Sequence, residues 1–170
     1  AVARRHGMAT HMDGARLMNA VVASGVSARD FAGPFDSAWI DFTKGLGAPV
    51  GAAIAGSHEF IAEAWRLKQQ MGGAMRQAGI IAAGGVFALR HHVKRLAEDH
   101  ANAKRLAEGL AALPGVRLDP KDVETNLVFF DLTGPLDGPT VVERLLARGI
   151  RMGAMSARTI RAVTHLDVSA

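Results

Sequence analysis

The chain of 170 residues contains no cysteine and no tyrosine, and its aromatic residues amount to only 5%. Without cysteine it cannot use a thiol nucleophile, hold an iron–sulfur cluster or bind zinc through thiolates. Apolar residues nevertheless make up 49% of the sequence and charged residues 21%, which is the balance of a globular protein rather than a disordered one. The length suits one ordinary domain and is too short for two large ones.

Long apolar runs and basic clusters are missing as well. No stretch approaches the roughly 18 apolar residues that a membrane-spanning helix needs, so we expect no membrane partner. Arg4 and Arg5 are followed by no apolar segment of the signal-peptide type, and we expect a cytoplasmic location. The 20 basic residues are interleaved with the 16 acidic ones. A nucleic-acid surface would cluster its basic residues among aromatics, so we expect no nucleic-acid partner.

Hydrophobic periodicity and turn residues predict an α/β chain whose pattern of secondary structure changes near residue 114. Before that point strands alternate with helices, and after it a small α+β unit follows. We expect the first residues to end a helix at Gly7, and the long helix to kink at Gly84 and Gly85. The predicted strands are 8–12, 37–43, 50–55, 116–118, 126–132 and 160–164. The predicted helices are 15–23, a short one capped by Ser27, about 57–71, 76–113 and 140–148.

Two predicted strands end in polar residues that stand out. The first runs into Asp13, and the second into Lys44, with a helix in the connection between them. A strand–helix–strand connection of this kind is right-handed and places its strands in parallel. Asp13 and Lys44 then share the carboxyl edge of a sheet, where open α/β sheets bind ligands. His11 precedes Asp13 by two residues and shares its side of the strand; it could approach a bound cofactor, but we expect it to be a packed strand residue.

An aspartate beside a lysine at such an edge has two interpretations. The simpler one is a salt bridge. The other is a pyridoxal phosphate site, in which Lys44 forms the Schiff base and Asp13 pairs with the protonated pyridine nitrogen. A fixed carboxylate would keep that nitrogen charged, and the charged ring is the electron sink of the chemistry. Spacing leaves both interpretations open, because many α/β proteins carry Asp-Gly after a strand and a lysine in a glycine-rich turn.

Longer segments make the chain recognisable as a whole. In order, they read HMDGARLMNA, TKGLGAPVG, GGAMRQAG, LAEDHANA and IRAVTHLDVS. Together they closely resemble the threonine aldolases of low specificity in the aromatic amino acid β-eliminating lyase/threonine aldolase family, which are pyridoxal phosphate enzymes of fold type I. Several motifs in order, spread over the chain, are far more specific than any one of them.

The resemblance implies a domain arrangement. Residues 1–114 would be the C-terminal portion of a pyridoxal phosphate-binding large domain, with a mostly parallel sheet and a long connecting helix. Residues 115–170 would be a small, incomplete α+β C-terminal domain. The resemblance also implies that the full-length enzyme is a homo-oligomer, a dimer or a tetramer.

The resemblance further implies roles for single residues. Lys44 matches the Schiff-base lysine, and Asp13 matches the partner of the pyridine nitrogen. Thr43 stands where family members often have serine, and its hydroxyl could donate to the cofactor phosphate or simply end the strand.

Three arginines match positions of the family as well. Arg16 and Arg161 match the pair that holds the substrate carboxylate, a task suited to a planar guanidinium. Arg76 matches a basic residue near the cofactor phosphate and the subunit interface. No metal ion is implied.

The activity implied is pyridoxal phosphate-dependent cleavage of L-threonine or L-allo-threonine to glycine and acetaldehyde. Family chains are longer, and their phosphate loop, ring-stacking histidine and candidates for the catalytic base precede the segment matched here. We therefore expect a fragment of the enzyme that is a poor catalyst by itself. Two alternatives stay open: another β-eliminating lyase or racemase of the same fold, and an inactive fragment with only an assembly role.

Overall fold

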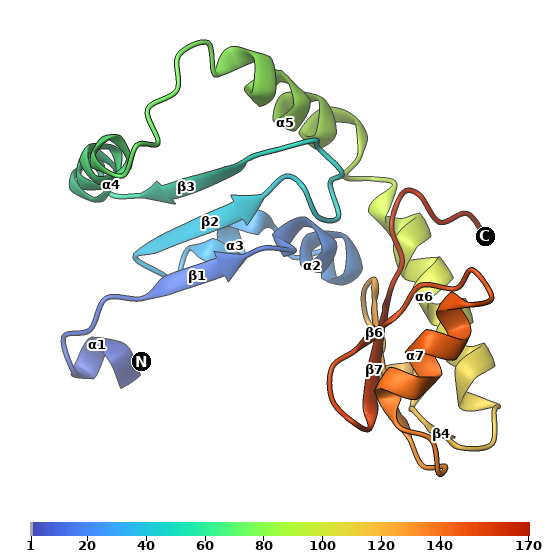
Figure 1. The fold of residues 1–170 in the computed structure, drawn as a ribbon. Helices are drawn as coiled ribbons and strands as arrows, with labels where there is room; N and C mark the ends of the chain where they lie inside the picture. Colours follow the sequence, from blue (N-terminus) through green and yellow to red (C-terminus); the bar gives the residue numbers. More distant parts are fainter. Residues whose placement is uncertain (1) are drawn as a thin grey trace. The chain divides into compact units, whose positions relative to one another are not determined.

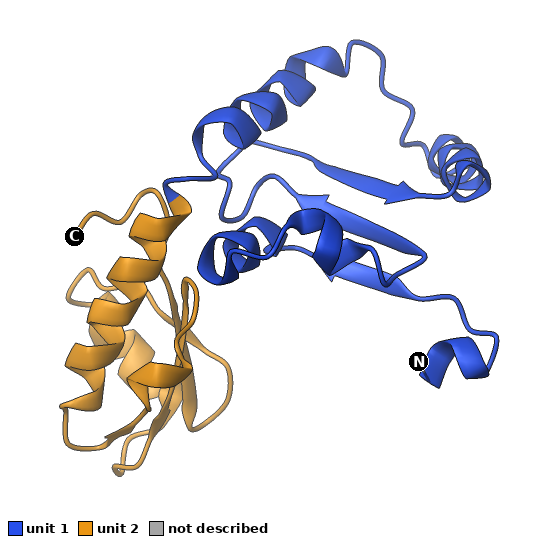
Figure 2. Cartoon of the chain, turned by 180° about the vertical axis from the view of Figure 1, so that it is seen from behind, with its two compact units in different colours: residues 1–95 blue, residues 96–170 orange. Residues whose placement is uncertain are grey.

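The computed structural model describes residues 2–170 and divides the chain into two compact units, residues 1–95 and 96–170 (Figure 2). The expected helix end is present: α1 (Val2–Arg5) is followed by Gly7, whose φ of +62° is the left-handed conformation that closes a helix. The prediction that the chain changes character near residue 114 differs from this division, because the helix before that point belongs to the second unit. The domains 1–114 and 115–170 stay a prediction.

The first unit is built on a three-stranded sheet of order β1-β2-β3 (Figure 1). Strands β1 (His11–Gly14) and β2 (Ser37–Asp41) are parallel, as the connection between them predicts. Strand β3 (Ala52–Gly56) runs antiparallel to β2. The sheet of this unit is therefore mixed, with one parallel and one antiparallel pair, and a mostly parallel sheet is not what the described residues show.

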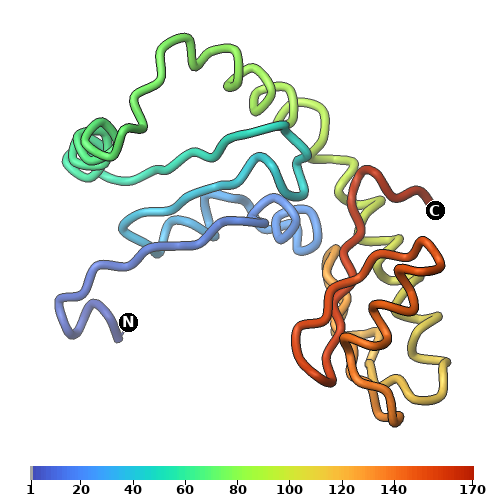
Figure 3. The backbone as a smooth tube through the Cα atoms, in the orientation of Figure 1, coloured from blue at the N-terminus to red at the C-terminus, as the bar shows by residue number. Residues whose placement is uncertain are grey.

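The helices of the first unit begin and end where local chemistry predicts. Ser27 and Ser57 accept hydrogen bonds from backbone N–H groups at the starts of α3 and α4, and Gly25 ends α2 with a φ of +73°. The trace in Figure 3 follows the chain from β3 into α4 and back to α5. The helices are α2 (Leu17–Ser24), α3 (Ala28–Ala32), α4 (His58–Gln70) and α5 (Gly79–His91).

The prediction of a single long helix over 76–113 is wrong. This segment forms two helices, α5 and α6 (Leu96–Ala111), separated by residues 92–95. Gly84 and Gly85 stay helical because they permit close packing instead of a kink. A Cβ on Gly84 would lie 3.0 Å from Pro49 Cδ, and one on Gly85 would lie 3.1 Å from Phe42 Cδ2. The glycines thus let α5 approach the segment that follows β2.

The second unit packs helix α6 against an antiparallel sheet of order β4-β5-β7-β6. Its core joins Ala103 and Ala107 of α6 to Val128 and Ile160 of the sheet. Apolar residues of α6 recur on one face at helical spacing, which explains why the sequence pattern identified this helix. The other elements are β4 (Val116–Arg117), η1 (Pro120–Asp122), β5 (Leu127–Leu132), α7 (Gly138–Leu146), β6 (Gly153–Ala154) and β7 (Thr159–Val163).

Candidate active site

Asp13 and Lys44 come to one face of the first sheet. Asp13 pairs with Trp39 across the parallel strands, and Asp41 follows Trp39 by two residues, so these three side chains share a face. Lys44, just after the end of β2, places its Nζ 5.1 Å from the centroid of the Trp39 ring. Helices α2 and α3 cover the opposite face, where Ala38 lies. The sheet thus presents a carboxylate and an amine on the same exposed side.

The turn that carries Lys44 is organised by Asp41. The Asp41 Oδ1 atom accepts hydrogen bonds from the N–H and the hydroxyl of Thr43, both at 2.6 Å, and from the Lys44 N–H at 3.3 Å. The other oxygen, Oδ2, lies 3.4 Å from Lys44 Nζ. The Thr43 hydroxyl therefore takes the strand-ending role in this structure, and its contact with a cofactor phosphate stays a prediction.

Electrostatics keep Asp41 ionised. Burial by itself would raise the pKa of Asp41, but the hydrogen bonds from Thr43 and the charge of Lys44 outweigh it and lower that pKa below the ordinary aspartate value. The sequence pattern did not identify Asp41 as the partner of Lys44. A signal was present, because an aspartate whose side chain bonds the backbone two residues on is a common turn former.

Helix α2 supports the same turn from beneath. Asn19 is only 2% exposed, and a Cβ on Gly45 would collide with its side-chain amide. Arg16, in the N-cap position of α2, lines a small cleft together with Asn19, Asp41 and Gly45. Two of the predicted residues, Arg16 and Lys44, are thus attached to neighbouring segments at the carboxyl edge of the sheet.

The other two predicted arginines lie on separate elements. Arg161 is on β7, in register with Phe129 and Gly153, and its neighbours in sequence, Ile160 and Ala162, point into the core. Its side chain therefore belongs to the face of the second sheet that α6 does not cover. Arg76 is exposed in the turn between α4 and α5. The joint action of Arg16 and Arg161 on one carboxylate stays a prediction.

His11 is not the packed strand residue that we expected. It is exposed, and its Nδ1 lies 2.8 Å from the hydroxyl oxygen of Ser37. Because it stands two residues before Asp13, it extends the same polar side of the sheet.

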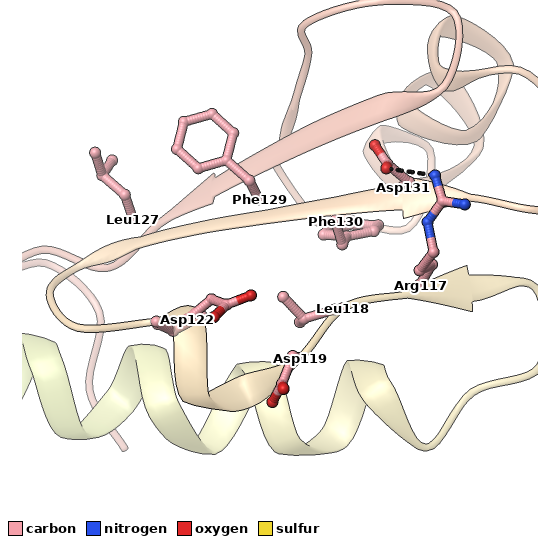
Figure 4. A pocket seen from close by; sticks show the side chains of 9 residues that line it. Arg117, Leu118, Asp119, Asp122, Leu127, Phe129, Phe130 and Asp131 are labelled. Atoms are coloured by element: carbon pink, nitrogen blue, oxygen red, sulfur yellow. Dashed lines mark hydrogen bonds and ion pairs between the residues drawn. The ribbon is translucent and has the colours of Figure 1, made fainter.

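A pocket of about 420 Å³ in the second unit contains none of the predicted site residues (Figure 4). It is bordered by the ion pair between Arg117 Nη2 and Asp131 Oδ2, at 2.9 Å, with Asp119, Asp122 and Phe129 around it. The hydrogen bond from Arg117 lowers the pKa of Asp131. Both members of the pair are exposed to water, so the pair contributes little to stability.

Two kinds of feature are absent from residues 2–170. No helix in this range has the length and apolar character to cross a bilayer. Within the same residues, no three histidine, aspartate or glutamate side chains are grouped so that they could ligate a metal.

Lys44 stands at the carboxyl end of a parallel strand, the edge at which open α/β sheets bind ligands. Residues 1–133 match the family model described as beta-eliminating lyase, and the chain belongs to that family. It is 39% identical to low-specificity L-threonine aldolase 1 of Arabidopsis thaliana, over 99% of this chain and 48% of that protein. It is 40% identical to the low specificity L-threonine aldolase of Escherichia coli strain K12, over 98% of this chain and 48% of that protein.

Solved structures agree on the fold. A protein from Exiguobacterium sp. 255-15, provisionally assigned to the aromatic amino acid β-eliminating lyases/threonine aldolases, superposes with a TM-score of 0.79 at 26% identity. The match covers 96% of this chain and 48% of that one. The threonine aldolase of Leishmania major gives a TM-score of 0.72 at 19% identity, over 98% of this chain and 49% of its own, and shows the fold alone. The chain spans about half the length of the relatives it matches.

Proposed function

We propose that the chain carries the lysine-bearing part of a pyridoxal phosphate-dependent L-threonine aldolase. The observation that carries the proposal is the placement of Asp13 and Lys44 on one face at the carboxyl ends of two parallel strands. Membership of the beta-eliminating lyase family and identities near 40% to threonine aldolases support it.

The residues present fit this cofactor. Lys44 offers an amine on a side chain that is 37% exposed, and Asp13 offers an exposed carboxylate on the same face. When bound, pyridoxal phosphate supplies an electron sink for the pair released by bond cleavage at the substrate Cα. Asp13 would keep the ring nitrogen of the cofactor positively charged. We place Thr43 and Arg76 near the phosphate.

Lys44 has to change its charge state in order to act. Only a neutral amine is nucleophilic, so binding of an aldehyde requires Lys44 to lose a proton and to leave its ion pair with Asp41. Asp41 then stays at the base of the turn, held by the Thr43 hydroxyl.

The proposed reaction cleaves a β-hydroxy-α-amino acid. Arg16 and Arg161 would bind its carboxylate and orient the Cα–Cβ bond for cleavage. The β-hydroxyl loses a proton, the Cα–Cβ bond breaks to release the aldehyde, and Cα takes up a proton to give glycine. We assign the base to none of the residues of this chain. We further propose that the enzyme is a cytoplasmic homo-oligomer.

Product analysis separates this activity from β-elimination, which the description of the family favours as the alternative. We expect the full-length protein to convert threonine into acetaldehyde and glycine. Formation of 2-oxobutyrate and ammonia would instead identify a β-eliminating enzyme, and no turnover in the full-length protein would favour an assembly role.

Covalent labelling tests the role of Lys44 directly. Borohydride reduction in the presence of pyridoxal phosphate, followed by peptide mapping, should place the cofactor on Lys44, and Lys44→Ala should abolish that adduct. Lys68→Ala is a matched control, because the Lys68 Nζ also lies over a tryptophan ring, 4.8 Å from the centroid of Trp65. A single specific adduct at another lysine in the Lys44→Ala protein would refute the assignment.

A further inference from the structure

Helix α5 reaches the lysine turn through a side chain that the proposed chemistry does not use. His92 follows the last residue of α5, and its Nδ1 lies 2.6 Å from the carbonyl oxygen of Leu46. A carbonyl oxygen only accepts hydrogen bonds, so His92 Nδ1 must carry the hydrogen. Leu46 is 2% exposed, which protects this bond from competition with water.

Leu46 belongs to the same turn as Lys44. The turn is closed by the Gly47 N–H, which donates to the Lys44 carbonyl at 2.9 Å, and by the Ala48 N–H, which donates to the Phe42 carbonyl at 2.7 Å. Both of these bonds lie within the turn and its flanks. The bond from His92 differs, because it ties the turn to a helix 46 residues further along the chain.

The ring of His92 is itself held in place. Phe87, five residues earlier on α5, meets it edge-on with ring centroids 5.4 Å apart. The backbone N–H of His92 donates to the Ala88 carbonyl, as expected at a helix end, whereas its side-chain Nδ1 meets a carbonyl outside the helix. The hydrogen bond of the imidazole Nδ1 therefore goes to Leu46 and not to the end of α5.

We propose that His92 is a positioning residue for Lys44: its Nδ1–H anchors the Leu46 carbonyl and so fixes the turn from which the lysine reaches the cofactor. This inference rests on the proposed function of Lys44. A shift of about 1 Å at a reacting group can lower a rate by up to about 100-fold. Loss of the hydrogen bond from His92 should therefore slow the modification of Lys44 while the fold stays intact.

The first test needs no variant. Nitrogen chemical shifts of the neutral His92 ring, measured by NMR on the full-length protein, should show hydrogen on Nδ1 and none on Nε2. The opposite tautomer would overturn the proposal, because it cannot donate to Leu46.

Two variants then separate the hydrogen bond from ring packing. His92→Phe keeps a ring beside Phe87 but has no donor, whereas His92→Asn places an amide N–H near the position of Nδ1. We expect faster hydrogen exchange at the Gly47 amide in His92→Phe and near-normal exchange in His92→Asn. The Thr133 amide, which donates to Gly115 in the other unit, serves as the reference for intact folding. Equal exchange rates at Gly47 in both variants and the parent protein would overturn the proposal. An equal loss of protection at Gly47 in His92→Phe and His92→Asn would overturn it as well.

Labelling connects the anchor to chemistry. With pyridoxal phosphate and borohydride, the rate of adduct formation at Lys44 relative to Lys68 should fall about tenfold or more in His92→Phe and recover in His92→Asn. If the full-length parent protein does not label Lys44 in preference to Lys68, the proposed function fails, while the tautomer and exchange measurements still decide whether His92 anchors the turn. An unchanged labelling ratio in His92→Phe, with Lys44 preferred in the parent protein, would refute the positioning role.

Discussion

Asp41 links the stability of the lysine turn to pH. Its pKa is lowered, because the hydrogen bonds from Thr43 and the charge of Lys44 overcome the opposing effect of burial. A carboxylate with a lowered folded-state pKa stabilises the fold above the pKa of the unfolded chain, and this contribution is lost as the pH falls through the folded value. We expect Asp41→Asn to lower the free energy of unfolding near neutral pH, and the gap to the parent chain to close in acid.

Urea unfolding at a series of pH values measures this effect. Tryptophan fluorescence is a suitable probe, because both tryptophans, Trp39 and Trp65, lie in the first unit. Asp122→Asn removes the same charge from an exposed site in the second unit and should show no such gap. A difference that persists unchanged below the folded pKa of Asp41 would contradict the assignment.

Asp13 should matter for turnover more than for cofactor binding. Its Oδ1 accepts the Ala15 N–H at 2.9 Å, and an asparagine oxygen can do the same, so Asp13→Asn preserves the local backbone. An amide cannot hold the ring nitrogen in its charged form. In the full-length enzyme we expect cofactor binding to persist and turnover to fall on the order of a hundredfold or more.

Steady-state kinetics and cofactor titration check this together. Asp30→Asn, on helix α3, is the control and should leave both quantities unchanged. Turnover near that of the parent enzyme in Asp13→Asn would reject the proposed partner of the ring nitrogen.

At the scale of the element, two helical glycines should respond oppositely to the same substitution. Gly109 in α6 has open space where a Cβ would stand, so Gly109→Ala should stabilise the second unit by about 0.5–1 kcal/mol. Gly85 in α5 is buried against Phe42, and an added Cβ would lie 3.1 Å from that ring. Gly85→Ala should destabilise the first unit by about 1 kcal/mol or more.

Hydrogen exchange in each unit, with tryptophan fluorescence for the first, measures both changes. Equal stabilisation by the two substitutions would show that α5 does not need its close approach to the segment after β2. That result would also weaken the account of why the glycines fail to kink the helix.

At the scale of the molecule, the chain by itself should associate and catalyse poorly. Strands β1 and β3 form the two edges of the first sheet, and exposed edges promote pairing with other chains. Large apolar side chains in the same unit are open to solvent, with exposed fractions of 48% for Ile54, 57% for Trp65 and 79% for Ile80. Such surface normally marks an interface or an aggregation hazard.

Sedimentation of the purified 170-residue chain should show concentration-dependent association. Threonine cleavage with saturating pyridoxal phosphate should be far below ordinary turnover. A monodisperse monomer with turnover of about 1 per second or faster would mean that the residues present suffice for the site.

The sequence by itself determined those features that depend on neighbours along the chain. Ser57 caps α4, Gly25 ends α2, and the apolar face of α6 repeats at helical spacing, because each rests on chemistry within a few residues. The parallel pairing of β1 and β2 followed from the helical crossover that connects them, and with it the shared edge of Asp13 and Lys44.

Only the tertiary structure decided what depends on contacts distant in sequence. The sequence pattern continues through 92–95, yet the helix is interrupted there, where His92 turns to Leu46. The sequence predicts a kink at Gly84 and Gly85, whereas in the structure these glycines allow close packing. Periodicity records which face of an element is apolar, but it does not record which backbone carbonyl or ring that face meets, and those partners fix where α5 ends and how the lysine turn is held.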